Sequence, residues 1–302
     1  MTPAKIVILG SNGQVGYELQ RSLLPLGEVI ALDRTQADLT QLEKLKQTLL
    51  DLKPNVIVNA AAYTAVDKAE EEHELAMLIN GTAPGVIAEA AKQLGALVIH
   101  YSTDYVFDGT KKEPYTENDT PNPINVYGKT KLAGEEAIKK IDFDYLILRT
   151  TWVYAARGHN FLKTMLRLAK EKEELSIVAD QYGAPTWARN IADVTAHILA
   201  SAQKEQKNDK FISGIYHLCA TGKTTWHGFA SAIIEYAKQL ASADIIKTKK
   251  VLPIVTDDYP LPAPRPKNSQ MDSSCLTARF GISHPEWNEA MKLCIDEVQE
   301  KI

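Results

Sequence analysis

Two residues whose side chains could transfer a proton stand four positions apart, Tyr127 and Lys131, in the stretch Tyr-Gly-Lys-Thr-Lys. On a helix, residues at this spacing project from the same face. A phenol has a pKa of about 10, and a nearby ammonium lowers that value by stabilising the phenolate. The pair therefore suits proton donation to a carbonyl oxygen while a hydride arrives at the carbon. Because Tyr-x-x-x-Lys also occurs by chance on exposed helix faces, its position in the chain must support the assignment.

A third candidate for this chemistry follows a short apolar run, Leu97-Val98-Ile99. The run continues into His-Tyr-Ser-Thr-Asp and so places Thr103 where a buried strand would end. Carboxyl ends of strands line the ligand crevice of a doubly wound sheet. Thr103 could donate a hydrogen bond to the same carbonyl oxygen there, or it could be an ordinary residue at a strand end.

A glycine-rich segment near the start of the chain predicts a dinucleotide site. Gly10, Gly13 and Gly16 follow an apolar run and precede a helical pattern, with Gln14 and Val15 between the last two glycines. Glycine permits the tight turn and the close approach of backbone to a pyrophosphate, which the positive end of the helix then faces. Asp33 ends the second apolar run about 20 residues later, where an acidic residue holds the adenosine ribose. Arg34 follows it and could instead bind a 2′-phosphate, so NADPH and NADH both stay open.

The arrangement of apolar runs predicts an α/β fold. In the first half, continuous apolar runs alternate with helical patterns, which is typical of parallel strands covered by helices on both faces. We expect a Rossmann doubly wound parallel sheet with a smaller, interleaved C-terminal substrate-binding domain. The NAD(P)-binding domain would be residues 1–150, its sheet completed by parts of 175–220, and 151–302 would mainly bind substrate. The proline-rich stretch 253–266 is expected to be an extended loop.

Composition narrows the function classes. The 302 residues are 45% hydrophobic and 24% charged, and the net charge is −4, so neither nucleic acid nor an anionic membrane is expected as a partner. Three widely spaced cysteines suggest no disulfide framework and no zinc site. No apolar run approaches the roughly 20 residues of a membrane span, and the first residues show no leader pattern. We therefore expect a cytoplasmic protein.

Several longer motifs occur in order along the chain. They are Gly-Gln-Val-Gly at 13–16, Val-Asn-Ala-Ala-Ala-Tyr-Thr-Ala-Val-Asp-Lys-Ala-Glu at 58–70, Ser-Thr-Asp-Tyr-Val-Phe-Asp-Gly at 102–109, Val-Tyr-Gly-Lys-Thr-Lys-Leu-Ala-Gly-Glu at 126–135, Arg-Thr-Thr-Trp-Val-Tyr at 149–154, Asp-Gln-Tyr-Gly-Ala-Pro-Thr at 180–186 and Arg-Pro-Lys-Asn-Ser at 265–269. Together they resemble the extended short-chain dehydrogenase/reductase family, and within it the dTDP-4-dehydrorhamnose reductases, over nearly the whole chain. The resemblance implies reduction of the C4 keto group of a dTDP-linked deoxysugar by NAD(P)H.

The resemblance also implies roles for single residues. Tyr127 would donate the proton, Lys131 would activate it and bind the nicotinamide ribose, and Thr103 would anchor the carbonyl. Further cofactor contacts would come from Asp38, Leu39, Ala62, Tyr63, Thr64 and Tyr101. The sugar would touch Thr103 and Asp104.

Three other assignments keep an alternative beside them. Trp152 would pack against the substrate, since a planar indole suits a sugar face or a thymine ring, or it is a core residue. Arg265 would bind the substrate pyrophosphate through its guanidinium, or it is a surface residue. Asn80 would order a proton-relay water, as in related dehydrogenases.

Some members of the resembled family dimerise around a magnesium ion held by three glutamates. The matching positions here are Glu18, Arg189 and Glu297. Magnesium requires oxygen ligands, whereas arginine offers no lone pair. We therefore expect no metal ligand set here, with Arg189 bridging the two carboxylates instead, and a monomer or a weak homodimer.

Two classes of alternative function remain. Sugar-nucleotide dehydratases and epimerases share the framework, but dehydratases carry an Asp-Glu pair where this chain has Asp104-Tyr105, and epimerases usually carry a small or hydroxyl residue in place of Asp104. A non-catalytic nucleotide-binding subunit, like the regulatory subunit of methionine adenosyltransferase, is the second class. The presence of Thr103, Tyr127 and Lys131 favours catalysis.

Overall fold

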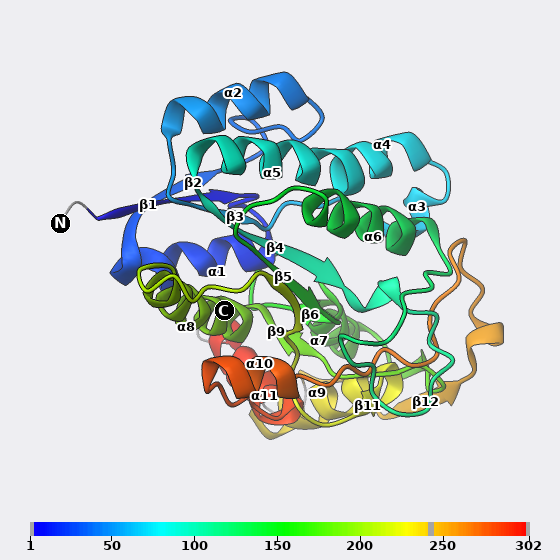
Figure 1. Ribbon diagram of the computed structural model, residues 1–302. Coiled ribbons are helices and arrows are strands. Elements are labelled where there is room, and N and C mark those ends of the chain that lie inside the picture. Colours follow the sequence, from blue (N-terminus) through cyan, green and yellow to red (C-terminus); the bar gives the residue numbers. More distant parts are fainter. Residues whose placement is uncertain (1–2, 241–244, 300–302) are drawn as a thin grey trace.

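A six-stranded parallel sheet forms the centre of the computed structural model, which describes residues 3–240 and 245–299 (Figure 1). Across the sheet the strands follow the order β2-β1-β3-β4-β5-β10, all parallel. Their bounds are β1 Ala4–Leu9, β2 Gly27–Leu32, β3 Val56–Asn59, β4 Leu97–Thr103, β5 Tyr145–Thr150 and β10 Gly214–His217. The predicted α/β class with a doubly wound parallel sheet is confirmed.

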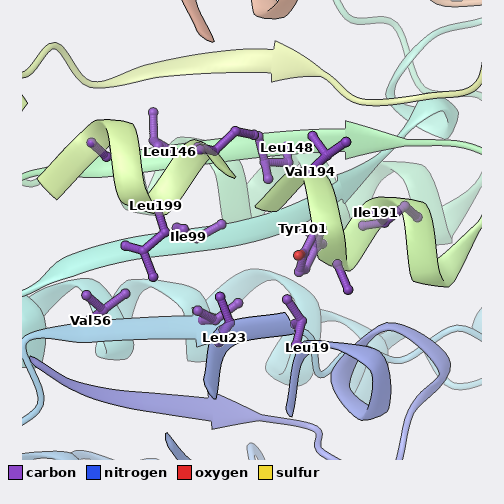
Figure 2. Close-up of a cluster of buried hydrophobic side chains, with 14 of the residues drawn as sticks. Leu19, Leu23, Val56, Ile99, Tyr101, Leu146, Leu148, Ile191, Val194 and Leu199 are labelled. Atoms are coloured by element: carbon purple, nitrogen blue, oxygen red, sulfur yellow. The ribbon is translucent and has the colours of Figure 1, made fainter. Parts of the chain in front are cut away.

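Helices cover both faces of this sheet. One face packs against α1 (Gln14–Leu23) and α8 (Ala188–Gln206), and the other against α2 (Leu42–Leu52), α5 (Ala83–Leu94) and α6 (Val126–Lys139). Successive strand residues alternate between the two faces. In β1, Ile6 and Ile8 join the cluster under α1 and α8 (Figure 2), whereas Val7 and Leu9 join the cluster under α2 and α5. Burial on both faces explains why the strands are continuous apolar runs.

The helical segment between His73 and Leu94 is interrupted. The structure has α4 at His73–Met77, a π-helical turn at Leu78–Thr82 and then α5. Pro84 explains the interruption, because a proline ring clashes with the carbonyl four residues earlier and lacks the donor for the regular bond. That carbonyl belongs to Asn80. It packs closely against Gly134 of α6, since a Cβ on Gly134 would lie 2.1 Å from the Asn80 carbonyl oxygen.

The second half of the chain forms a smaller body beside the carboxyl ends of the strands. It contains the strand pairs β6 Val153–Tyr154 with β9 Thr186–Trp187, β7 Glu174–Val178 with β12 Lys250–Ile254, and β8 Tyr182–Gly183 with β11 Thr224–Thr225. Helices α7 (Phe161–Glu171), α9 (Trp226–Leu240) and α11 (Trp287–Gln299) share one apolar cluster with the first two of these pairs. Two short helices, α3 (Val66–Ala69) and α10 (Ser274–Phe280), lie in connections.

The proline-rich stretch departs in part from the expected extended loop. Pro253 lies inside β12, and residues Thr256–Asp258 form a 3₁₀ turn before the irregular remainder. A proline is tolerated there because β12 belongs to a two-stranded sheet and has an unpaired edge.

Arg189, near the start of α8, joins three helices. Its Nε lies 3.1 Å from a carboxylate oxygen of Glu18 in α1, and its Nη2 lies 2.8 Å from one of Glu297 in α11. The expected bridge between the two glutamates is therefore confirmed. A guanidinium between the carboxylates does not fit a magnesium site, because it occupies their oxygens and repels a cation.

Candidate active site

A cleft of about 680 Å³ opens at the carboxyl ends of β1 to β4. The order in which successive strands are added reverses between β1 and β3, the position where doubly wound sheets bind nucleotides. Most residues expected to contact a cofactor line this cleft: Gly10, Gly13, Gln14, Val15, Asp33, Arg34, Asp38, Leu39, Ala62, Tyr63, Thr64, Tyr101, Tyr127 and Lys131. The exception is Gly16, which lies behind the loop.

Two glycines of the loop are required by close approach of backbone. Gly10 has φ +81°, and a Cβ on it would lie 2.8 Å from Cα of Ala61 after β3. A Cβ on Gly16 would lie 2.1 Å from the carbonyl oxygen of Gly10. Gly16 therefore acts by letting α1 pack against the turn, and its position outside the cleft agrees with that role.

An acidic and a basic residue, Asp33 and Arg34, follow β2 at the rim of the cleft. The Asp33 carboxylate accepts hydrogen bonds from the backbone and hydroxyl of Thr35 and from Asn12, and the Thr35 bonds are the main reason its pKa is lowered. The Arg34 side chain is 76% exposed and lies 3.4 Å from a carboxylate oxygen of Asp38. Because an exposed ion pair contributes only about 0–1 kcal/mol, Arg34 can leave it at little cost. Asp33 could accept a hydrogen bond from a ribose hydroxyl, and Arg34 could bind a phosphate, because both residues line the cleft.

Lys131 is buried and attached to β4. Its Nζ donates to the carbonyl oxygen of Tyr101 at 2.6 Å and lies 3.4 Å from Nε2 of His100. Burial lowers the pKa of Lys131 to about 8, although the nearby Glu135 carboxylate opposes the change. The lysine thus anchors α6, which also carries Tyr127, to the strand that ends in Thr103.

The expectation that Lys131 lowers the pKa of Tyr127 is wrong for this structure. Burial raises the pKa of Tyr127 to about 12, a hydrogen bond with Thr103 lowers it, and the charge of Asp104 raises it. The ammonium is directed to the Tyr101 carbonyl instead. A phenol with this pKa stays protonated at neutral pH, so the arrangement suits an acid.

Thr103 and Asp104 lie beside Tyr127, behind the cleft. The Thr103 hydroxyl donates to Oδ1 of Asp104 at 3.1 Å and accepts from the Tyr105 backbone at 3.2 Å. Burial raises the pKa of Asp104 to about 6, against the effect of the Ser269, Thr103 and Thr151 hydroxyls. Within the described residues, Oδ2 of Asp104 makes no hydrogen bond of good geometry.

The other two expected substrate residues lie outside the cleft and already have partners. The Trp152 indole stacks on Trp226 with ring centroids 3.7 Å apart. Arg265 is not an unpaired surface residue: its Nη2 donates to Asp67 at 2.8 Å and its Nη1 to the carbonyl of Ala263 at 2.7 Å. Trp152 follows the end of β5, and Arg265 lies in the proline-rich stretch 253–266.

The Asn80 side-chain amide bonds three groups of the protein. Its Oδ1 accepts from the Tyr63 backbone at 2.8 Å, and its Nδ2 donates to the Tyr63 carbonyl at 3.0 Å and to Thr130 Oγ1 at 3.2 Å. The buried amide therefore fixes the loop after β3 to α6.

Several residues of the site were not predicted. Those lining the cleft are Asn12, Ala37, Ala60, Ala61, Ala65, Ile79, Ser102, Thr150, Val153, Gly158 and His159. Behind it, Arg149 forms a buried two-bond pair with Glu135 at 2.9 and 2.6 Å. Glu135 stands four residues after Lys131, a spacing that could have been recognised, whereas Gly158 and His159 carry no local signal.

Comparison with known proteins agrees with this geometry. The family described as "RmlD substrate binding domain" matches residues 4–300. A dTDP-4-dehydrorhamnose reductase of Burkholderia thailandensis is 53% identical, covering 97% of this chain and 99% of its own, and one of Salmonella typhimurium is 47% identical, covering 97% of each. The crystal structure of a dTDP-4-dehydrorhamnose reductase from Bacillus anthracis in complex with NADP has a TM-score of 0.87 at 36% identity, covering 98% of this chain and 100% of that one.

The buried Asp104 carboxyl predicts a pH-dependent stability difference. Its folded pKa of about 6 lies above the ordinary 3.8, so the folded state binds the proton more tightly, and ionisation destabilises it as pH rises from about 4 to above 6. Asp104→Asn should therefore gain stability relative to wild type over this range, by up to about 3 kcal/mol. Urea unfolding at about pH 4.5 and about pH 7.5, on either side of that pKa, measures the change. A difference independent of pH would contradict the assignment.

Proposed function

The chain belongs to the RmlD substrate binding domain family, and we propose that it reduces the C4 keto group of dTDP-4-dehydro-L-rhamnose to dTDP-L-rhamnose with a hydride from NAD(P)H. One observation carries the proposal: Tyr127, Lys131 and Thr103 meet at the end of β4, beside a cleft at the β1/β3 crossover. The names of the relatives reported above indicate the substrate of the proposal.

The cofactor would occupy the cleft formed by the glycine loop, the ends of β2 and β3, and α6. A nicotinamide cofactor bound there supplies the hydride. The loop backbone and the start of α1 would face its pyrophosphate, and Asp33 or Arg34 its adenosine ribose. Asn80 would keep the Tyr63 backbone in place as one wall.

Tyr127 would donate a proton to the oxygen at C4 of the sugar. Its raised pKa keeps the phenol protonated until negative charge develops on that oxygen. Thr103 would turn its hydroxyl from Asp104 to the same oxygen. Lys131 would hold the ribose and, through its bond to the Tyr101 carbonyl, would keep α6 with Tyr127 against β4.

The second half of the chain would mainly bind the substrate, and residues 1–150 the cofactor. Asp104 would accept from sugar hydroxyls through its unpaired oxygen. Trp152 would pack against a sugar or thymine ring, and Arg265 would exchange part of its bonding for the pyrophosphate.

Net oxidation of cofactor separates this reading from its alternatives. A dehydratase or epimerase recycles its hydride, and a regulatory subunit performs no reduction. The test supplies a dTDP-4-keto-6-deoxysugar and NAD(P)H, follows the loss of reduced cofactor and identifies the product. Turnover without net NAD(P)H loss, or none at all, would overturn the proposal.

Replacing the proton donor should abolish most activity. Tyr127→Phe removes the hydroxyl but keeps the ring, so cofactor binding should stay nearly intact while kcat falls by roughly 100-fold or more. Tyr145→Phe, at the start of β5 and away from the cleft, is the matched control. Rates of Tyr127→Phe within a few-fold of wild type would exclude Tyr127 as the acid.

Arg34 should contribute to cofactor choice. If its guanidinium leaves Asp38 for a 2′-phosphate, Arg34→Ala weakens NADPH binding about tenfold or more and NADH binding little, as loss of a charge-assisted bond predicts. Fluorescence titration with both cofactors measures this. Arg167→Ala, which removes an exposed ion pair with Glu171, is the control. Equal losses for the two cofactors would remove Arg34 from the phosphate site.

We further propose that the protein is cytoplasmic and acts as a monomer or a weak homodimer. No helix among the described residues is long and apolar enough to cross a membrane, and the cysteines form no disulfide within the same residues. The Glu18–Arg189–Glu297 bridge supports assembly without a metal.

Chelation should therefore leave the assembly unchanged. With Arg189 in the place of a ligand, neither EDTA nor added Mg²⁺ has a carboxylate site to empty or fill. Light scattering after EDTA treatment and after Mg²⁺ addition should give the same mass. A dimer that dissociates on chelation and re-forms with Mg²⁺ would show the opposite.

A further inference from the structure

Trp152 has a backbone conformation that a bulky residue rarely adopts. Its φ is +45°, one of three positive values at non-glycine residues in the described chain. Left-handed backbone is costly for a residue with a large side chain and persists only where the surroundings impose it. Such residues are concentrated at functional sites.

The groups that impose this conformation come from the second half of the chain. Trp226, the first residue of α9, stacks on the Trp152 ring at 3.7 Å and 12°. Gly183 of β8 lies against the same ring, since a Cβ there would be 2.6 Å from Trp152 Cε2. Only glycine leaves room for the indole at that position.

Trp226 is itself held in place. Its Nε1 donates to Oε1 of the buried Gln181 at 3.2 Å, and its ring also contacts Phe161 at 4.7 Å between centroids. Gln181 bonds onward to Thr256, whose hydroxyl donates to Asp180. The stack is thus part of a rigid body rather than a contact between two mobile side chains.

Trp152 lies in the segment that connects the cleft with the buried Asp104 carboxyl. Its neighbours Thr150 and Val153 line the cleft, and the Thr151 hydroxyl acts on the Asp104 carboxyl. Trp152 itself is only half-buried. One part of the indole is therefore fixed by Trp226 and Gly183, and another part stays available.

We infer that Trp226 is a positioning residue for the sugar-nucleotide substrate: with Gly183, it holds the Trp152 indole as a fixed wall of the substrate pocket. This inference rests on the proposed function. A wall that is fixed before binding does not lose side-chain freedom when the substrate arrives. Trp226 acts through Trp152 and needs no contact with the substrate.

The experiment compares Trp226→Leu, Trp226→Phe and Trp152→Ala with wild type. Loss of the stack should raise the KM for the dTDP-4-keto sugar about tenfold, the factor that corresponds to about 1.4 kcal/mol, while kcat and the KM for NAD(P)H change little. Phenylalanine can still stack, so Trp226→Phe should restore most of the wild-type KM. Trp152→Ala should raise the KM at least as much as Trp226→Leu.

Circular dichroism supplies a readout that does not depend on activity. Among the described residues, Trp152 and Trp226 are the only two indoles in ring contact, and closely stacked indoles give a coupled pair of bands. Both Trp226 variants and Trp152→Ala should lose this signal. Trp287→Phe, which changes a tryptophan packed on Phe229 in the apolar cluster, should keep it and the wild-type KM.

Gly183→Ala tests the same wall if Trp226→Leu does not fold. The added methyl, which lies on β8 and not on α9, displaces the Trp152 indole. The coupled bands should therefore weaken and the sugar KM should rise. An unchanged sugar KM in folded Trp226→Leu or Gly183→Ala, or the absence of coupled bands from wild type, would overturn the inference. A wild-type protein that shows the coupled bands but oxidises no NAD(P)H would instead overturn the proposed function.

Discussion

Lys131 places an ammonium group where only 2% of the residue reaches solvent, and the rest of the site is arranged around that charge. A buried charge is strongly unfavourable unless partners replace its water. Here the Tyr101 carbonyl accepts one bond and the Glu135 carboxylate supplies the opposing charge. Glu135 in turn needs Arg149 and Ser102. This buried cation therefore requires a connected set of polar groups on α6, β4 and β5, and this set determines how α6 lies on the sheet.

The helix can meet these demands only because small residues let it approach closely. A Cβ on Gly128 would lie 2.1 Å from the carbonyl oxygen of Tyr105, and Gly134 is as close to that of Asn80. The second contact coincides with the π-helical turn before Pro84, which in turn directs the Asn80 amide to the Tyr63 backbone. The position of α6 is thus transmitted to the loop after β3, which the same Asn80 amide bonds. That loop and Tyr127, which both line the cleft, are fixed by the same packing.

How much of this could be predicted depends on how local each interaction is. Strands β1, β3, β4 and β5 were predictable because burial on both faces leaves continuous apolar runs, and the glycine loop was predictable because its turn and the start of its helix lie within seven residues. The pKa of Tyr127 was not, because the direction of the Lys131 side chain depends on β4. Arg265–Asp67 and Trp152–Trp226 were also missed as pairs, since the partners lie far apart in the chain and no motif links them. The interruption before Pro84, in contrast, follows from the proline itself.

The free protein keeps two of the proposed substrate-binding groups paired with its own carboxylates. Thr103 donates to Asp104 and Arg265 donates to Asp67, so neither donor is left buried without a partner. In the proposed complex the keto oxygen and the pyrophosphate would take over these bonds. A substrate that lacks either group would have to leave the internal pairs intact and would forgo the new contacts. The exchange therefore favours ligands that carry both a keto oxygen and a pyrophosphate at the right separation, which is a form of specificity that a preformed, unpaired site would not provide.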